Sequence, residues 1–177
     1  QMCIRDSRPV GIDRSSPHWQ EAFLHPRDIP GVVVQLAQAA APMTATPRPE
    51  PWPTPRPGRA ASLDYVAHAV VDEDEGLRLY AGLLRGVPDA EGEDAGVRWI
   101  ELAWPGPGRV RLLHARDPDA SQASKELRTF LGDRRGAVHH LAFTVDRPYD
   151  FPGASGTAND RWLVPADANF GVTLVLR

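Results

Sequence analysis

Two side chains that can exchange hydrogen bonds with a polar ligand occupy equivalent positions in an internal repeat. The stretch LDYVAHAVVD, residues 63–72, aligns with VHHLAFTVDR, residues 138–147, and the alignment pairs Tyr65 with His140. Both stretches are short, apolar and rich in β-branched residues, which predicts strands. Because side chains alternate between the two faces of a strand, we expect Tyr65 and His140 on equivalent faces and His139 on the opposite face.

Other side chains with acid–base chemistry have no partner at an informative spacing. Glu101 and Glu21 are candidate bases by residue type alone. The one cysteine, Cys3, lies in a segment that we exclude below, so we expect neither a disulfide framework nor a thiolate metal site. We expect three further histidines to be ordinary surface or strand-packing residues, namely His25, His68 and His114.

A second repeat concerns the end of the same kind of module. Residues 23–37, FLHPRDIPGVVVQLA, align with residues 162–177, WLVPADANFGVTLVLR, if one residue is inserted in the later copy. Each copy predicts a strand, a turn and a closing strand. The pairs in this alignment are Pro26 with Pro165, Asp28 with Asp167, Gly31 with Gly171 and Gln35 with Val175. Because a module's end precedes a complete module, we expect the chain to be a fragment of a longer array.

The composition divides the chain into four segments. Residues 1–7, QMCIRDS, resemble a translated sequencing adapter of the kind found in metagenomic fragments, and we exclude them from fold reasoning. Residues 8–38 are interpreted as the C-terminal hairpin of a truncated upstream module. Residues 39–62 contain seven prolines, which predicts an extended linker, with a ligand for an adaptor domain as the alternative. Residues 63–177 form the main domain.

Overall composition restricts the classes of partner. The chain has 177 residues, is 42% hydrophobic and carries a net charge of -3 with acidic and basic residues interspersed. This charge distribution argues against nucleic-acid binding, which favours a basic domain or stripe. No apolar run approaches the ~20 residues of a membrane span, and no signal peptide follows residue 7, so we expect a cytoplasmic protein. The preference for arginine over lysine indicates a GC-rich bacterial genome.

Helical periodicity and capping residues predict two helices in residues 63–177. Asp72 is expected to cap the first helix with Glu75 as its capping-box partner, and Gly86 ends it. Asp119 is expected to cap the second, which stops at Gly132. No helical period is found between residues 146 and 161. The expected strands are residues 18–23, 32–36, 63–71, 97–104, 109–115, 139–145, 162–165 and 171–176.

The phrases AFLHPRDIPGVVVQLAQ, LDYVAHAVVD, RVRLLHARD and GAVHHLAFTVD resemble the vicinal oxygen chelate superfamily. This superfamily includes glyoxalases, bleomycin-resistance proteins, extradiol dioxygenases and methylmalonyl-CoA epimerases, and the likeness is to the epimerase and glyoxalase-like branch. It covers residues 20–38 and 63–177. The resemblance implies an α+β fold in which paired βαβββ modules form a cup-shaped mixed sheet. The second module lacks its helix, and a fragment of another module precedes the pair.

In that family the cup encloses a divalent metal, and the resemblance implies where its ligands would lie. Tyr65, Arg111, His140 and Val175 stand at the four ligand positions. Of these four, only His140 is a usual metal ligand, because arginine stays protonated and valine has no donor atom. Gln35 falls at a closing ligand position of the upstream module. The resemblance therefore implies a degenerate metal site, no cofactor in this chain, and a divalent metal only in a full-length parent.

Two functions from different classes follow from the resemblance. The first is a parent enzyme, a metal-dependent isomerase or lyase acting on a small carbonyl, thioester or 2-oxo substrate, whose enediolate the metal would stabilise. The second is a metal-free small-molecule binding or dimerisation module, as a homodimer or paired with an upstream module. In it, Tyr65, Arg111 and His140 would converge on an anionic or carbonyl ligand. The purely structural alternative is that His140 packs against Tyr65 and Arg111 lines a solvated rim.

Overall fold

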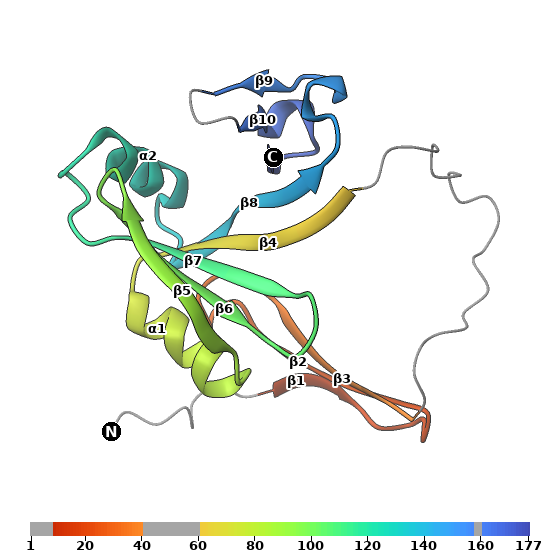
Figure 1. Ribbon diagram of the computed structural model, residues 1–177. Helices are drawn as coiled ribbons and strands as arrows, with labels where there is room; N and C mark the ends of the chain where they lie inside the picture. Colours follow the sequence, from red (N-terminus) through yellow and green to blue (C-terminus); the bar gives the residue numbers. More distant parts are fainter. Residues whose placement is uncertain (1–8, 41–60, 158–160) are drawn as a thin grey trace. The chain divides into compact units, whose positions relative to one another are not determined.

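The computed structural model describes residues 9–40, 61–157 and 161–177 (Figure 1). The chain divides into two compact units, residues 1–57 and residues 58–177. We describe each unit by itself. The expected adapter-derived residues 1–7 lie outside the described residues, as does most of the expected linker.

The first unit contains a three-stranded antiparallel sheet in the order β1-β2-β3. Its strands are β1 (Pro9–Asp13), β2 (Trp19–Leu24) and β3 (Val34–Ala39). Strands β2 and β3 correspond to the expected hairpin, although β3 begins and ends later than predicted. β1 was not predicted, because its sequence PVGID contains both a proline and a glycine, which are rare within strands.

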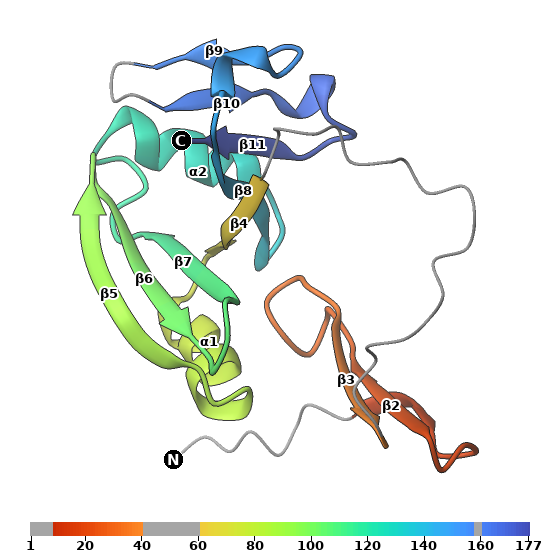
Figure 2. The same ribbon diagram turned by 45° about the vertical axis from the view of Figure 1, so that its right-hand side comes forward.

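The second unit is built on an eight-stranded mixed sheet in the order β5-β6-β7-β4-β8-β11-β10-β9 (Figure 2). Its strands are β4 (Ala61–Val70), β5 (Val87–Asp94), β6 (Val97–Ala103), β7 (Arg109–Ala115), β8 (Gly136–Val145), β9 (Ser155–Gly156), β10 (Trp162–Val164) and β11 (Thr173–Leu176). β4 and β8 pair antiparallel at the centre, and each pairs in parallel with the last strand of its own half. The two halves therefore repeat one topology, which confirms the expected fold class of paired βαβββ modules.

Helices accompany the first half of the sheet and connect it to the second. α1 (Glu73–Leu77) continues as a π-helical segment, η2 (Arg78–Leu83), and its N-cap is Asp72, whose carboxylate accepts from the Glu75 N–H. α2 (Gln122–Leu131) begins after Ser121, so the expectation that Asp119 caps it is wrong. The Ser121 hydroxyl accepts from the Ser124 N–H, whereas the Asp119 N–H donates to Asp117 in the preceding turn.

The second half lacks a crossover helix, as the sequence predicted. Among the described residues between 146 and 161, the only helical segment is a short 3-10 turn, η3 (Pro148–Asp150). The remaining 3-10 turn of this half is η4 (Ala166–Ala168). Strand β5 was not predicted, because its sequence VPDAEGED is acidic and interrupted by proline and glycine.

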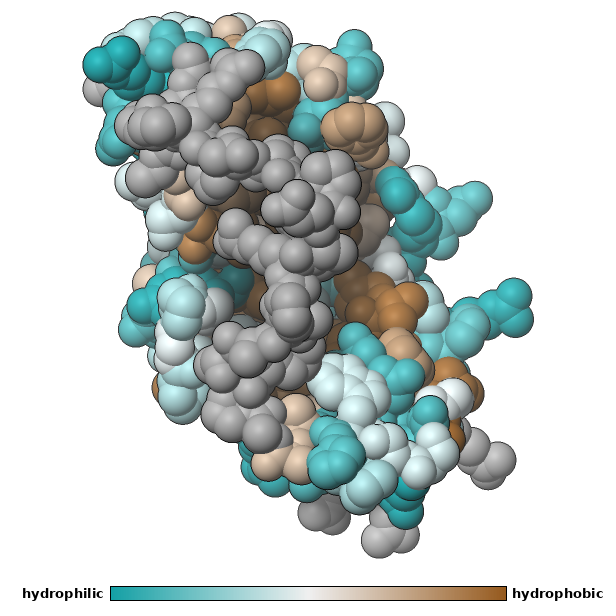
Figure 3. All heavy atoms as spheres, turned by 90° about the vertical axis from the view of Figure 1, so that its right-hand side faces the viewer, coloured by the Kyte–Doolittle hydropathy of each residue, from teal (hydrophilic) through white to brown (hydrophobic). Residues whose placement is uncertain are grey.

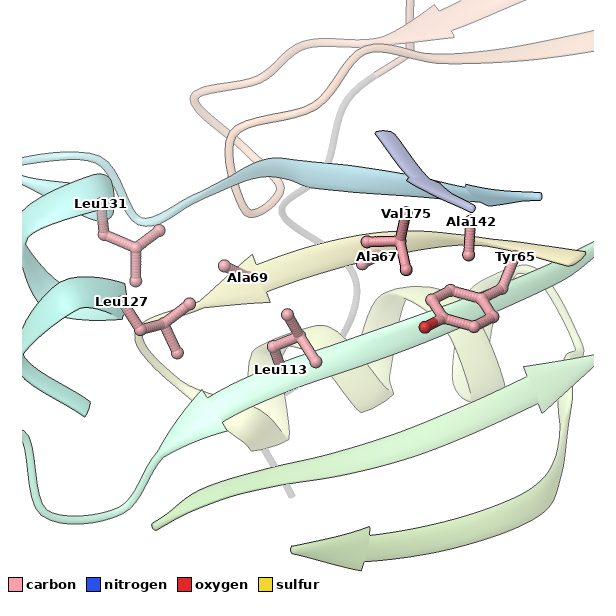
Figure 4. Packing of buried hydrophobic residues seen from close by; sticks show 8 residues of the cluster. All are labelled: Tyr65, Ala67, Ala69, Leu113, Leu127, Leu131, Ala142 and Val175. Atoms are coloured by element: carbon pink, nitrogen blue, oxygen red, sulfur yellow. The ribbon is translucent and has the colours of Figure 1, made fainter. Parts of the chain in front are cut away.

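One cluster of buried hydrophobic residues in the second unit joins the sheet to α2. Alanines on the two central strands are fully buried, which allows α2 to approach the sheet closely. Figure 4 shows Leu127 and Leu131 of α2 beside Ala69 of β4 and Leu113 of β7. The same cluster continues to Tyr65, Ala142 and Val175 near the other end of β4. Elsewhere on the molecule, apolar side chains also reach the surface among hydrophilic ones (Figure 3).

Candidate functional site

A cavity of about 440 Å³ lies on the concave side of the eight-stranded sheet. All four positions that the resemblance singled out line this cavity, namely Tyr65 on β4, Arg111 on β7, His140 on β8 and Val175 on β11. They come from the first and last strand of each half, as the pairing of the modules requires. The other lining residues are Asp94, Ala95, Val97, Trp99, Leu113, Ala123, Thr157, Arg161 and Leu163.

Tyr65 and His140 are diagonal neighbours across the central strand pair. Tyr65 pairs with Ala142 and Ala67 pairs with His140, and the two aromatic rings meet edge to face with centroids 5.7 Å apart. Tyr65 is 4% exposed. The contact between His140 and Tyr65 that the structural alternative described is therefore present, inside the cavity wall.

The expectation that His139 and His140 lie on opposite faces is wrong. The register of β4 and β8 shifts at this point, since Ala67 pairs with His140 and His68 pairs with Val138. His139 is thus the extra residue of a β-bulge, and a bulge interrupts the alternation of side chains. The Nδ1 atoms of the two histidines lie 2.8 Å apart, and the ring of His139 also packs edge to face on Phe130 of α2, with centroids 4.7 Å apart.

Both histidines of this pair are held neutral by their surroundings. Burial lowers the pKa of His139. Burial is also the largest cause for His140, followed by electrostatic repulsion of a second proton from His139, Arg111 and Arg161, and together they lower the pKa of His140 to about 3. One Nδ1 atom must donate its proton to the other, so protons on both Nδ1 atoms would remove this hydrogen bond. At neutral pH His140 therefore offers hydrogen bonds but no charge.

Arg111 does not line a solvated rim, because it is enclosed by protein groups on several sides. Its Nη2 donates to Oε2 of Glu101 at 2.6 Å, and its Nε donates to the same oxygen at 3.1 Å. The guanidinium carbon lies 3.8 Å from the ring centroid of Tyr65 and 4.5 Å from that of Trp99. Nε of Arg109 lies 3.5 Å from the other oxygen of Glu101. The charge of Arg111 is therefore compensated within the protein, and Glu101 acts as its partner.

Among the lining residues that the sequence analysis did not single out, Trp99 and Arg161 matter most for the chemistry of the cavity. Trp99 follows from strand alternation, because it lies two residues before Glu101 and opposite Leu113 in the register of β6 and β7. Arg161 lies outside any regular pattern, and no sequence signal marks it. Its guanidinium has no ion pair among the described residues, and its charge reaches the imidazole of His140. Within the described part of the chain, Arg161 is thus a cation of the cavity wall that forms no ion pair, and the carboxylate of Asp94 lines the same cavity.

Gln35 and Glu21 lie in the first unit, on neighbouring strands. Nε2 of Gln35 donates to Oε2 of Glu21 at 2.6 Å, and the indole N–H of Trp19 donates to the same oxygen at 3.0 Å.

His68 of the second unit is fully buried, and its Nδ1 lies 2.9 Å from the Tyr80 hydroxyl. His114 lies beside the carbonyl of Val70, with Nδ1 at 3.5 Å from the oxygen.

The residues at the four family ligand positions do not fit a divalent metal. Val175 contributes only methyl groups, and the guanidinium of Arg111 places a positive charge beside His140. Within the ranges that the structure describes, no group of three or more His, Cys, Asp or Glu side chains is arranged to hold a metal ion. A catalytic zinc site needs about three such protein donors.

None of the described helices has the length and apolar character needed to cross a membrane.

No protein-family model matches this sequence, and no curated protein does. Solved structures do resemble it. A hypothetical protein from Bacillus halodurans C-125 has a TM-score of 0.51 and 19% identity, covering 66% of this chain and 93% of that chain. Methylmalonyl-CoA epimerase from Mycobacterium tuberculosis has a TM-score of 0.48 and 23% identity, covering 64% and 85%. A Streptomyces coelicolor methylmalonyl-CoA epimerase has a TM-score of 0.48 and 19% identity, covering 64% and 94%.

These comparisons concern the fold. In the second unit the chain forms two repeated halves, and in each half the first strand pairs in parallel with the last. The first strands of the two halves then pair with each other, so that the sheet curves around one cavity. The second unit of this chain therefore has the paired βαβββ fold that the resemblance to the vicinal oxygen chelate superfamily implied.

Proposed function

We propose that the second unit binds a small molecule in its cavity without a metal ion. The observation that carries this proposal is the pairing of Arg111 with Glu101 at a position where the family places a metal ligand. A cavity of about 440 Å³ falls within the usual range of small-molecule sites, roughly 300–1,000 Å³. The cavity thus has a size suited to a small molecule, and an Arg111–Glu101 ion pair stands where a metal ligand would be expected.

The lining indicates the class of ligand. Much of the wall is apolar, from Trp99, Leu163 and Val175 among others, so it suits the carbon skeleton of the ligand. Arg161 supplies a cation that has no ion pair among the residues the structure describes, and such a cation favours an anionic group such as a carboxylate. Because Nδ1 of His140 is engaged by His139, Nε2 is the nitrogen available for a carbonyl or carboxylate oxygen. We therefore infer a small carboxylate with an apolar body, such as a 2-oxo acid.

A second candidate function concerns the longer protein that we expect this chain to come from. Such a parent would be a metal-dependent isomerase or lyase of the epimerase or glyoxalase kind. The observation that favours it lies in the first unit, where Gln35 stands at the closing ligand position of the upstream module and its Nε2 donates to Glu21 on the neighbouring strand. Oxygen donors suit divalent metals, but fold alone does not assign this activity, since one fold hosts both catalysis and binding.

The binding proposal predicts that 2-oxo acids bind in the presence of excess EDTA. Phenylpyruvate and 2-oxobutyrate serve as probes, with the corresponding amides as uncharged counterparts. In ¹H–¹⁵N NMR spectra we expect chemical-shift changes at His140 and Val175 with the acids and weaker changes with the amides. Arg161→Gln should weaken binding of the acids about tenfold or more, because a charge-assisted hydrogen bond contributes about 1.5–3 kcal/mol.

The matched control for this experiment is Arg147→Gln, which removes an exposed arginine that does not line the cavity. We expect it to leave binding unchanged. Binding that appears only after a divalent metal is added, or shifts that map outside the cavity, would contradict the proposal.

The ligand count also predicts that the purified chain holds no stoichiometric divalent metal and has no epimerase or glyoxalase turnover. His140 is the single usual ligand among the four positions, and Tyr65 offers only a phenol. Elemental analysis after dialysis without chelator should therefore give well below one metal per chain. About one bound metal per chain, lost in His140→Ala, would overturn the metal-free proposal.

A further inference from the structure

The first unit reproduces the closing strands of the second unit. The orders β1-β2-β3 and β9-β10-β11 are both antiparallel, and the pairs Leu24–Val34 and Val164–Leu174 each join residues ten positions apart. Gly31 and Gly171, which follow the two turns, both have positive φ angles, of 69° and 87°. The strand registers thus correspond without the inserted residue that the sequence alignment required.

The two copies differ at one edge. β11 pairs with β10 on one side and, in parallel, with β8 on the other, where the Arg177 N–H donates to the Phe143 carbonyl at 3.0 Å. Within the described residues, β3 pairs with β2 alone. The Ala40 N–H donates to the His18 carbonyl of the β2 side at 3.0 Å. Because backbone groups alternate in direction along a strand, the N–H groups of Gln35 and Ala37 face the opposite, outer edge of β3.

This outer edge has none of the features that protect sheet edges from pairing. Proteins block exposed edges with charged residues, prolines, bulges or very short strands. β5 carries four carboxylates and a proline, β1 begins with a proline and contains a register shift, and β9 has two residues. β3 has the sequence VQLAQA, and no charged residue occurs from position 29 to position 47. Among the four edge strands of the two sheets, β3 is therefore the one suited to pairing.

We propose that the outer edge of β3 binds an extended segment of another polypeptide that runs parallel to β3 and has the apolar character of β8. The internal copy supplies the register. Val175, the equivalent of Gln35, pairs with Ala142, and Thr173 pairs with His140. The incoming strand takes the place of β8 beside β11, so that the first unit becomes the closing strands of a second module. This interaction is separate from ligand binding in the second unit and goes beyond the function proposed above.

The test uses the full chain and a synthetic peptide with the sequence of residues 136–146, GAVHHLAFTVD, with a scrambled peptide as the control. Hydrogen exchange of individual amides is followed by NMR. We expect the amides of Gln35 and Ala37 to exchange at least about tenfold more slowly with the peptide. The Leu36 amide faces β2 and should change little, because it is already hydrogen-bonded in the free chain.

Ala37→Pro removes one N–H from the outer edge and should abolish the protection by the peptide. Proline is tolerated where the N–H of an edge strand faces solvent, so continued protection of Leu36 would show that the β2–β3 pairing persists. Ala37→Val retains the N–H and should bind the peptide as the unchanged chain does. Equal protection by the scrambled peptide, protection confined to other strands, or pairing of β3 with a second copy of the chain would each overturn the proposal.

Discussion

Replacing Glu101 with glutamine is expected to destabilise the second unit by roughly 3 kcal/mol, because it leaves the guanidinium of Arg111 without its counter-charge. The Arg111 side chain is 17% exposed and that of Glu101 is 12% exposed, so water cannot replace the lost carboxylate effectively. Both Nε and Nη2 of Arg111 donate to one oxygen of Glu101. The free energy of unfolding, measured by urea titration, provides the test.

The matched control is Glu91→Gln, which breaks the ion pair between Glu91 and Arg98. That pair is short, at 2.7 Å, but the Glu91 side chain is 65% exposed. Exposed pairs contribute about 0–1 kcal/mol, so the control should lose no more than this. A double variant, Glu101→Leu with Arg111→Met, should recover most of the stability, because an apolar pair of similar volume leaves no buried charge. Equal losses in Glu101→Gln and Glu91→Gln would show that the buried pair has no special role.

The pairing of Arg111 with Glu101 shows where the sequence analysis stopped. The two residues are ten positions apart and meet because β6 and β7 form a hairpin whose register sets Glu101 opposite Arg111. Strand periodicity predicted both strands, and the resemblance placed Arg111 in the cup. The partner depended on the register, which is fixed by the turn and by side-chain packing together. The strand pattern therefore predicted the two strands but not the charged partner of Arg111.

The histidine pair shows a second limit of the same kind. The repeat correctly predicted that Tyr65 and His140 lie on strands of one sheet, and the structure places both in the cavity wall. It failed for His139, because a β-bulge adds one residue to β8 opposite β4. A bulge depends on pairing between strands distant in sequence, and the apolar alternation of β8 alone does not reveal it. Arg161 was missed for a different reason, since it precedes β10 outside any periodic pattern of the sequence.

Lowering the pH from 7 to 5 is expected to destabilise the second unit through His140. In the folded protein the pKa of His140 is lowered to about 3, chiefly by burial, whereas in the unfolded chain it returns to its ordinary value of about 6.5. Between these values the unfolded state binds a proton that the folded state does not. The stability contribution is therefore complete above about pH 6.5 and is lost as the pH falls toward 3, at about 1.4 kcal/mol per pH unit.

The measurement is the free energy of unfolding of the second unit at pH 8, 7, 6 and 5, in the unchanged chain and in His140→Gln. We expect the unchanged chain to lose about 2 kcal/mol between pH 6.5 and pH 5 through this residue, and the variant to lose less over the same interval. Burial also lowers the pKa of His139, so part of the dependence should remain in the variant. The window ends at pH 5 because carboxylates, with ordinary pKa values near 4, begin to titrate below it.

An equally steep loss of stability in both proteins would mean that His140 accepts a proton in the folded state. Water or a counter-charge would then have to reach the imidazole through the cavity. Direct NMR titration of the His140 ring would then show a pKa well above 3.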